Sequence, residues 1–215
     1  MTYAPYTLDR AELHSRVELR VAPAPKPKKP QPRVWITADT HFAHAHIIDL
    51  CQRPFENVEQ MDQVMADNWN RAVGIGDTVY HLGDFCLGNF DVALDILCEL
   101  NGHIKLVPGG HDERWLRQFA KLKHVNDDFA EGMLEVLPPI YNLHHNGKHA
   151  VLCHYPLSSW EQQHYGAVML HGHSHGRSGA TPNRYDVGVD LNNFTPILMD
   201  EAIRLAETYV YGKAT

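Results

Sequence analysis

The sequence predicts a layered α/β sandwich, and three observations support this fold class. Short apolar runs typical of strands alternate with longer stretches in which apolar residues recur at helical spacing. Turn-forming residues separate these segments, and one such pair, Asn146-Gly147, stands between two strand-like runs. Strands and helices mixed in this order pack as layers around a shared core.

The first part of the expected domain consists of strands that feed into helices. Short apolar runs predict strands at 34–38, 78–82 and 104–107. Apolar periodicity predicts helices at 58–73, 90–100 and 113–123. Asn101-Gly102 stops the second helix, and Asp112 is placed to cap the N-terminus of the third.

The second part begins with an expected hairpin over 140–153, because Asn146-Gly147 favours a type I′ turn. Further strands are predicted at 167–170 and 185–189, and an amphipathic helix over 199–210 closes the domain. We find no internal repeat. The domain is therefore expected to span 34–215.

An N-terminal extension with a proline- and lysine-rich linker is expected over 1–33. Its last part, 21–33, reads VAPAPKPKKPQPR, and so many prolines allow neither a helix nor a central strand. We interpret it as a semi-rigid, solvated spacer. A contact of its lysines with nucleic acid or acidic lipid is the alternative.

Composition narrows the function classes. The 215 residues carry a formal net charge of −7 and no extended basic stretch, which disfavours extended nucleic acid as a partner and favours small substrates. Four scattered cysteines form no C-x-x-C pair, so we interpret them as reduced thiols of a cytoplasmic protein. No signal-like or membrane-spanning apolar run occurs, so no membrane association is predicted.

Histidine stands out, since its 16 copies rival the 19 lysines and arginines together. The carboxylates and imidazoles that matter follow predicted strands, and strand ends in an α/β sheet share one rim. Five short patterns lie there: Asp39-Thr40-His41, Gly83-Asp84, Gly109-Gly110-His111-Asp112, Cys153-His154 and Gly172-His173-Ser174-His175. Two cations about 3.5–4 Å apart need a shared carboxylate. Asp84 is expected to be that bridge.

These patterns, in this order, resemble the calcineurin-like metallophosphoesterases, whose motifs run D-x-H, G-D, G-N-H-D/E, H and G-H-x-H. The resemblance covers 34–200, and the segments DTHFAHAHII, RPF, NWN and DTVYHLGDF look like compact stand-alone members of bacteria and phages. It implies a four-layer αββα sandwich of two mixed sheets flanked by helices. It also implies a dinuclear metal-dependent phosphoesterase, acting on a phosphomonoester or phosphodiester through a metal-bridging hydroxide.

The resemblance also implies two ligand sets, which share Asp84. The first metal would be held by Asp39, His41, Asp84 and His175, and the second by Asp84, His154 and His173. The family has a further asparagine ligand where this sequence has Gly110, so the second site is expected to be weaker. Mixed imidazole and carboxylate donors suit two transition-metal ions, with Mn²⁺ expected and Fe, Zn or Ni as alternatives.

His111 matches the family histidine that contacts the scissile phosphate and assists the leaving group, so it is the expected catalytic residue. Four residues are candidate substrate contacts, with a solvated or supporting role as the alternative for each: His44, Arg53, Arg114 and Arg177. The predicted substrate is a small phosphodiester or nucleotide.

A metal-binding scaffold that lost catalysis together with the family asparagine is the alternative, although the intact His111 favours an enzyme. A hydrolase of the β-lactamase fold would need H-x-H-x-D-H, which His41-Phe42-Ala43-His44-Ala45-His46 does not match.

Overall fold

The computed structural model describes residues 31–125 and 132–208. The predicted extension and linker therefore lie outside the described residues, apart from 31–33. The C-terminal end of the helix predicted over 199–210 lies outside them as well. No helix within the described ranges has the length and apolar character needed to span a membrane.

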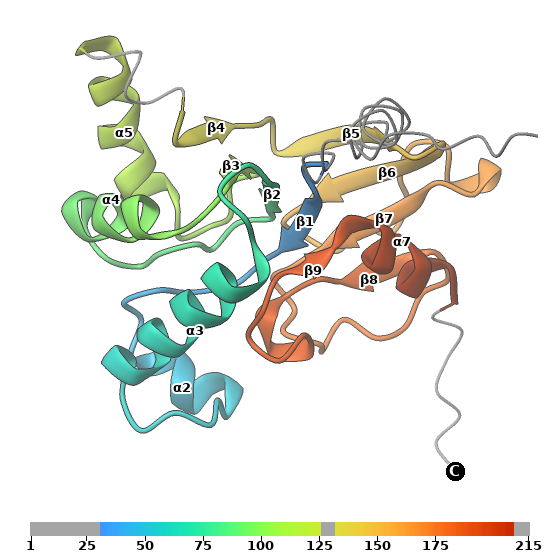
Figure 1. Ribbon diagram of the computed structural model, residues 1–215. Coiled ribbons are helices and arrows are strands. Elements are labelled where there is room, and N and C mark those ends of the chain that lie inside the picture. The colour runs from blue at the N-terminus through green and yellow to red at the C-terminus, as the bar shows by residue number, and fades with distance from the viewer. Residues whose placement is uncertain (1–30, 126–131, 209–215) are drawn as a thin grey trace, which may run out of the picture. The chain divides into compact units, whose positions relative to one another are not determined.

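Two mixed sheets form the framework (Figure 1). In the first, of order β4-β3-β2-β1-β9, four parallel strands carry one antiparallel edge strand. Its strands are β1 (Val34–Thr37), β2 (Thr78–His81), β3 (His103–Leu106), β4 (Leu134–Val136) and β9 (Ile197–Leu198). The second, of order β5-β6-β7-β8, consists of β5 (Ile140–His145), β6 (Lys148–Cys153), β7 (Val168–His171) and β8 (Arg184–Asp186).

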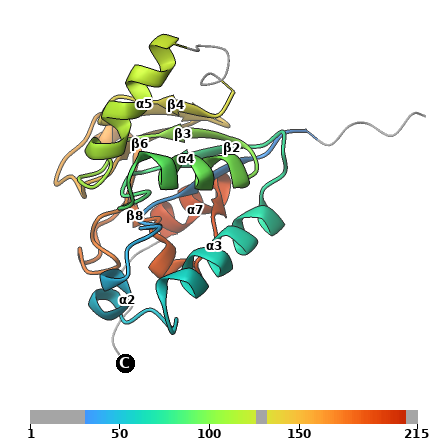
Figure 2. The same ribbon diagram turned by 90° about the vertical axis from the view of Figure 1, so that its left-hand side faces the viewer.

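Helices cover the five-stranded sheet on one face (Figure 2). They are α3 (Val58–Ala72), α4 (Phe90–Glu99) and α5 (Glu113–Val125), and the short α2 (His46–Cys51) lies beside them. Side-chain oxygens cap two of these helices, since Asn57 accepts a hydrogen bond from Gln60 N and Asn89 accepts one from Val92 N. The predicted α/β architecture of two mixed sheets flanked by helices is confirmed.

The core has two main parts because side chains alternate between the faces of a strand. On β1, Trp35 packs toward the helices, whereas Ile36 packs toward the second sheet. The helix α7 (Met199–Thr208) contributes to this second part with Met199, Ala202, Ile203 and Ala206, and it contacts strands of both sheets. The buried strands thus fix the positions of the loops that follow them.

Most predicted elements lie within two residues of their expected bounds, and the predicted hairpin is confirmed. Asn146 and Gly147 have φ of 47° and 78°, as a type I′ turn requires. The strand predicted over 185–189 needs correction: β8 ends at Asp186 and the 3₁₀ turn η2 (Val189–Leu191) follows. The chain turns there because Gly188 N donates to the Asp186 carboxylate at 2.9 Å.

Four further short elements of the described residues were not predicted: α2, β4, β9 and the 3₁₀ turn η1 (Gln163–Tyr165). The six residues of α2 are fewer than two helical turns, and the three residues of β4, three of η1 and two of β9 are shorter than the apolar runs that revealed the other strands. The unpredicted strands β4 and β9 form the two edges of the five-stranded sheet, where each is held by pairing with a neighbouring strand.

The carboxyl ends of β1, β2, β3, β6, β7 and β8 open onto one rim, where the two sheets meet. A single parallel bridge between Ala38 and Gly188 joins the end of β1 to the segment after β8. The backbone N–H of His173, after β7, also donates to the Asp39 carboxylate at 2.8 Å. Loops that are far apart in the sequence therefore converge at this seam between the sheets.

Candidate metal centre

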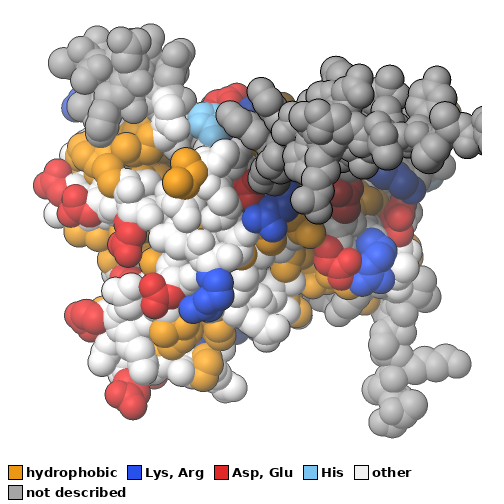
Figure 3. All heavy atoms as spheres, viewed as in Figure 1, with side chains coloured by type: hydrophobic (Ala, Val, Ile, Leu, Met, Phe, Trp, Pro, Cys, Tyr) orange, Lys and Arg blue, Asp and Glu red, His pale blue; other side chains and the backbone are white. Residues whose placement is uncertain are grey.

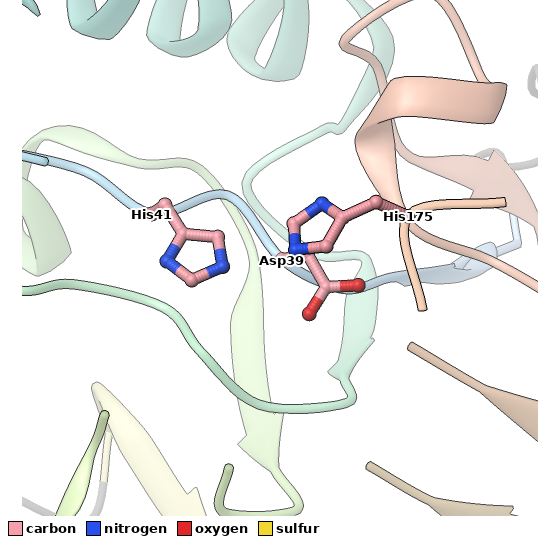
Figure 4. Close-up of side chains that lie close together, drawn as sticks. All are labelled: Asp39, His41 and His175. Atoms are coloured by element: carbon pink, nitrogen blue, oxygen red, sulfur yellow. The ribbon is translucent and has the colours of Figure 1, made fainter. Parts of the chain in front are cut away.

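The structure brings all six predicted metal ligands to this rim. Asp39 and His41 follow β1 and Asp84 follows β2, while His154, His173 and His175 follow β6 and β7. Figure 4 shows the side chains of Asp39, His41 and His175 close together, with the first two on one loop and the third on another.

Five of the six ligand candidates have a left-handed backbone. The φ values are 57° at Asp39, 53° at His41, 54° at Asp84, 65° at His173 and 46° at His175. Each such residue costs about 1–3 kcal/mol, so it persists only where the surroundings hold it. Here Asp39 N donates to Gly83 O and His41 N donates to Asp84 O, each at 3.0 Å. Several left-handed residues that lie together at one place are typical of a functional site.

Close backbone approach explains two glycines of the motifs. A Cβ at Gly83, where φ is +86°, would lie 2.4 Å from the Gly109 nitrogen. A Cβ at Gly172 would lie 2.6 Å from the Ala38 Cβ and 2.7 Å from an Asp39 carboxylate oxygen. Glycine is therefore required for these loops to come so close.

In both Asp39 and Asp84, one carboxylate oxygen accepts a backbone hydrogen bond, and the other oxygen faces histidine rings. Asp39 Oδ2 accepts the hydrogen bond from His173 N, while its Oδ1 is buried without a hydrogen-bond partner. Asp84 Oδ1 accepts from His111 N at 2.9 Å. Its Oδ2 lies 3.7 Å from His41 Nε2 and 3.4 Å from His154 Nε2. Both carboxylates are thus fixed and still have one oxygen to offer.

The donor atoms form two clusters whose members lie within 4.8 Å of one another: Asp39, His41 and His175 in one, and Asp84, His154 and His173 in the other. Asp84 also groups with His41 and His111. It therefore lies between the two clusters, as expected of a shared ligand.

Hydrogen bonds orient two of the histidine rings. His154 Nδ1 lies 2.8 Å from Leu82 O, so Nδ1 carries the proton and Nε2 keeps a free lone pair. His175 Nδ1 lies 2.7 Å from an Asp190 carboxylate oxygen, with the same consequence for its Nε2. A histidine that ligates a metal is commonly held in this way through its other nitrogen.

Burial shapes the charge of the centre. It raises the pKa of Asp39 to about 7, an effect that His175 and His154 partly offset. Burial also lowers the pKa of His41, so its imidazole is neutral near pH 7. Burial opposes ionisation of Asp84 and His154, but the attraction between the two side chains outweighs it, so the pKa of Asp84 is lowered and that of His154 is raised. A bound cation would replace protons at this centre.

Three buried side-chain atoms of the candidate ligands indicate whether these residues could hold a metal ion. Among the described residues, Asp39 Oδ1, His41 Nε2 and His154 Nε2 are buried without a hydrogen-bond partner. Buried polar atoms without a partner are costly, and here they converge on one place. Carboxylate and imidazole donors suit divalent transition metals. The residues therefore fit a divalent metal ion.

His111 lies at the open side of the centre. Its side chain is 46% exposed, and its Nε2 is 4.0 Å from Asp84 Oδ2. Its ring centre lies 5.4 Å from that of His41 and 5.9 Å from that of His44. His111 can therefore reach a substrate at the rim, and His44 is placed beside it.

Arg53, a predicted substrate contact, requires correction because its buried guanidinium is fully engaged within the protein. It forms hydrogen bonds of 2.8 and 3.0 Å to the Asp190 carboxylate. It also donates to Asp39 O at 2.7 Å and Thr40 O at 2.9 Å. Arg53 thus holds the strained loop after β1 and, through Asp190, the ring of His175.

The other two predicted arginine contacts are exposed. Within the described residues, the Arg177 side chain forms only long contacts, at 3.4 Å to Ser174 O and 3.6 Å to Cys51 Sγ. Arg114 lies near the start of α5, close in sequence to His111. The side chains of Arg114 and Arg177 are therefore free to contact a substrate, whereas the side chain of Arg53 is not.

The predicted capping role of Asp112 also requires correction. Its carboxylate accepts hydrogen bonds from the backbone of Asp84, Phe85 and Gly109 and from Trp115 Nε1. Asp112 thus ties the loop after β3 to the loop after β2. Burial nevertheless raises its pKa, and the backbone hydrogen bonds partly offset that shift.

Sequence reasoning missed two supporting carboxylates, Asp186 and Asp190. Asp186 accepts hydrogen bonds from Ser174 Oγ at 2.5 Å and from Gly176 N at 2.9 Å, which fixes the loop of His173 and His175. A usable signal was present for Asp190, which directly follows the strand predicted over 185–189, as the recognised ligands follow their strands; Asp186 fell inside that predicted strand.

Gly110 has room for a side chain. A Cβ there would meet only the Tyr155 hydroxyl, at 3.4 Å, and the backbone is not left-handed. The Tyr155 ring also packs edge-on against His154 and His173, with 4.7 Å between ring centres in both cases. Tyr155 therefore lies beside the second ligand cluster.

Comparison with curated proteins finds relatives without an assigned activity. The chain is 32% identical to the uncharacterized protein MJ1445 of Methanocaldococcus jannaschii over 184 residues, which cover 81% of this chain and 92% of that protein. It is 27% identical to the gene 66 protein of Mycobacterium phage D29 over 179 residues, covering 73% and 87% of the two chains. No protein-family model matches the sequence.

Two solved structures align with this chain. AQ665, a protein of unknown function from Aquifex aeolicus, aligns with a TM-score of 0.61 and 25% identity over 81% of this chain and 99% of its own. The E. coli phosphoesterase YfcE aligns with a TM-score of 0.34 and 11% identity over 73% and 78% of the two chains. A likeness at that level carries no argument about activity.

Proposed function

The chain belongs to the same family as the uncharacterized protein MJ1445 of Methanocaldococcus jannaschii, and from the geometry of its rim we propose that it is a metal-dependent phosphoesterase. The observation that carries the proposal is the pair of three-residue donor clusters that Asp84 connects. A structural site for one tetrahedral ion uses four ligands, whereas six donors converge here. The order of the motifs, which resembles calcineurin-like enzymes, supports phosphoesters as the substrates.

Two divalent ions would be held by the two clusters, with Asp84 as the shared ligand. Bound at this rim, such ions would neutralise charge on the phosphoryl oxygens and lower the pKa of bound water. The Asp190 carboxylate orients the ring of His175, and Leu82 O orients the ring of His154, so that Nε2 of each ring can bind an ion. The proposed metal is Mn²⁺, with Fe, Zn or Ni as alternatives.

His111 has the role of proton donor in this proposal. Its backbone is anchored to Asp84 Oδ1, while its half-exposed ring lies beside His41 and His44. In its imidazolium form it would donate a hydrogen bond, and then the proton, to the departing ester oxygen. His44, Arg114 and Arg177 remain candidates for contacting the phosphate.

The test is hydrolysis of a chromogenic phosphodiester by the purified chain, with elemental analysis of the same sample. We expect up to two ions per chain and turnover that a chelator abolishes and Mn²⁺ restores. A chain that takes up Mn²⁺ and hydrolyses no phosphoester would instead support the alternative, a metal-binding scaffold. A chain that binds no ion would overturn both.

Gly110→Asn should tighten the binding of the second ion. The introduced asparagine would add a neutral oxygen donor beside His154 and His173, and the position accepts a Cβ without left-handed strain. We expect wild-type Mn²⁺ loading to be biphasic, and the variant to lower the Mn²⁺ concentration at half-saturation of the weaker step roughly tenfold. Calorimetric titration and turnover measure it, with Gly110→Ala as the matched control. Equal half-saturation in all three proteins would show that another group already completes the site.

A further inference from the structure

A long groove opens beside the rim, between α5 and β4. It has a volume of about 1000 Å³, within the range of ligand pockets. Phe119 and Leu134 are 3% and 4% exposed and form its floor, while Val136 is 46% exposed at its side. Figure 3 shows hydrophobic side chains gathered on this part of the surface, near α5.

The charges around the groove are paired within the protein. Glu113 receives a hydrogen bond of 2.5 Å from Arg117, one turn further along α5. Glu135 accepts one of 2.8 Å from Lys105, and the ring of His103 lies 3.8 Å from it. The groove thus presents apolar side chains between neutralised ion pairs, and it suits an uncharged group better than a second phosphate.

The groove is continuous with the candidate metal centre. Gly109, Gly110 and Tyr155 line the groove, and Gly109 and Tyr155 also border the centre. Gly109 approaches Asp84 so closely that a Cβ there would lie 2.4 Å from Asp84 Oδ1. The Tyr155 ring contacts His154 and His173 on its other side. A molecule whose phosphate lay at the rim could therefore extend directly into the groove.

We propose that this groove binds the nucleoside part of a nucleotide ester whose phosphate is held at the rim. The inference rests on the proposed phosphoesterase function and specifies its substrate class. Two features favour a base over an alkyl chain. Aromatic rings of Phe119 and Tyr155 line the groove, and such rings pack well against a flat ring. The polar side chain of His103 also lines the groove, and a base edge has hydrogen-bonding groups that it could meet, whereas an alkyl chain has none.

The experiment compares diesters with the same leaving group, the p-nitrophenyl esters of thymidine monophosphate, of methyl phosphate and of octyl phosphate, hydrolysed by the Mn²⁺-loaded chain. We expect kcat/KM to be roughly 10–100-fold higher for the thymidine ester than for the methyl ester, because only the thymidine can fill the groove. The same ratio is measured for Val136→Asn, which makes the groove wall polar, and for Ala120→Trp, which fills the groove from an exposed helix position.

Leu198→Asn is the matched control, since Leu198 is 39% exposed on β9, the opposite edge of the same sheet. We expect the ratio to fall toward one in both groove variants and to stay at the wild-type value in the control. A wild-type ratio near one, or groove variants with the wild-type ratio, would overturn the inference. Faster hydrolysis of the octyl ester than of the thymidine ester would overturn it in favour of a lipid.

Calorimetric binding of thymidine monophosphate and methyl phosphate separates this inference from the proposed activity. Tighter binding of the nucleotide to wild type, lost in Val136→Asn, would support the groove even if no ester were hydrolysed, and the proposed activity alone would then be wrong. If both esters were hydrolysed and thymidine monophosphate and methyl phosphate bound equally well, the proposed activity would be supported and the proposed role of the groove would be wrong.

Discussion

Asp84→Asn should remove most of the bound metal and lower kcat/KM by roughly a thousandfold or more. The substitution keeps an oxygen that can accept the hydrogen bond from His111 N, so the loop after β3 retains its anchor. It removes the negative charge that lies 3.7 Å from His41 Nε2 and 3.4 Å from His154 Nε2. Both ligand clusters therefore lose affinity together.

His111→Gln is the matched comparison for Asp84→Asn. It lies outside the six-donor set, so metal content should stay close to wild type while kcat falls by about 10²–10⁴ for a poor leaving group. Elemental analysis and kinetics on the same samples separate the two effects. If Asp84→Asn kept two ions per chain, Asp84 would not be the shared ligand. A loss of metal in His111→Gln would make His111 a ligand rather than a proton donor.

Arg53→Met should destabilise the protein by about 3–5 kcal/mol, because it leaves buried partners without their donor. Asp190 would lose a bidentate ion pair, and the carbonyls of Asp39 and Thr40 would lose their hydrogen bonds. For a domain of this size we expect the Tm of the metal-free protein to fall by about 10 °C. Arg53→Lys should rescue little, since an ammonium lacks the fork that engages all these acceptors.

Arg177→Met is the control for Arg53→Met, because Arg177 is exposed and makes only long contacts. Its Tm should stay within about 1 °C of wild type. Thermal unfolding of chelator-treated protein gives the stabilities, and a Mn²⁺ titration shows whether the looser loop weakens the cluster that contains Asp39. An unchanged Tm in Arg53→Met would contradict the role that we assign to this arginine.

The convergence of the candidate donors at one rim could be predicted from the sequence, because each of them follows a buried strand and buried strands are visible as apolar runs. The loops after β1, β2, β6 and β7 carry Asp39, Asp84, His154 and His173, and the topology alone brings them to one rim. Long helices were predicted for the same reason, since their apolar period extends over several turns.

What could not be predicted depends on contacts between distant residues. Arg53 looks like a surface arginine in the sequence, and only folding places it against Asp190, 137 positions away. Asp112 precedes a helix as a capping residue does, but its carboxylate engages the loop after β2 instead. The edge strands β4 and β9 likewise exist through their partners rather than through a pattern of their own.

The seam between the sheets also has a consequence for how the chain matures. Neither sheet holds a complete cluster, since Asp39 and His41 require His175, and Asp84 requires His154 and His173. During synthesis an emerging N-terminal half therefore exposes donors that cannot yet close around an ion. If the centre binds metal as proposed, the ions can be captured only after the strands β6 and β7 have left the ribosome and paired. A centre with bound metal would then indicate that the whole domain has folded.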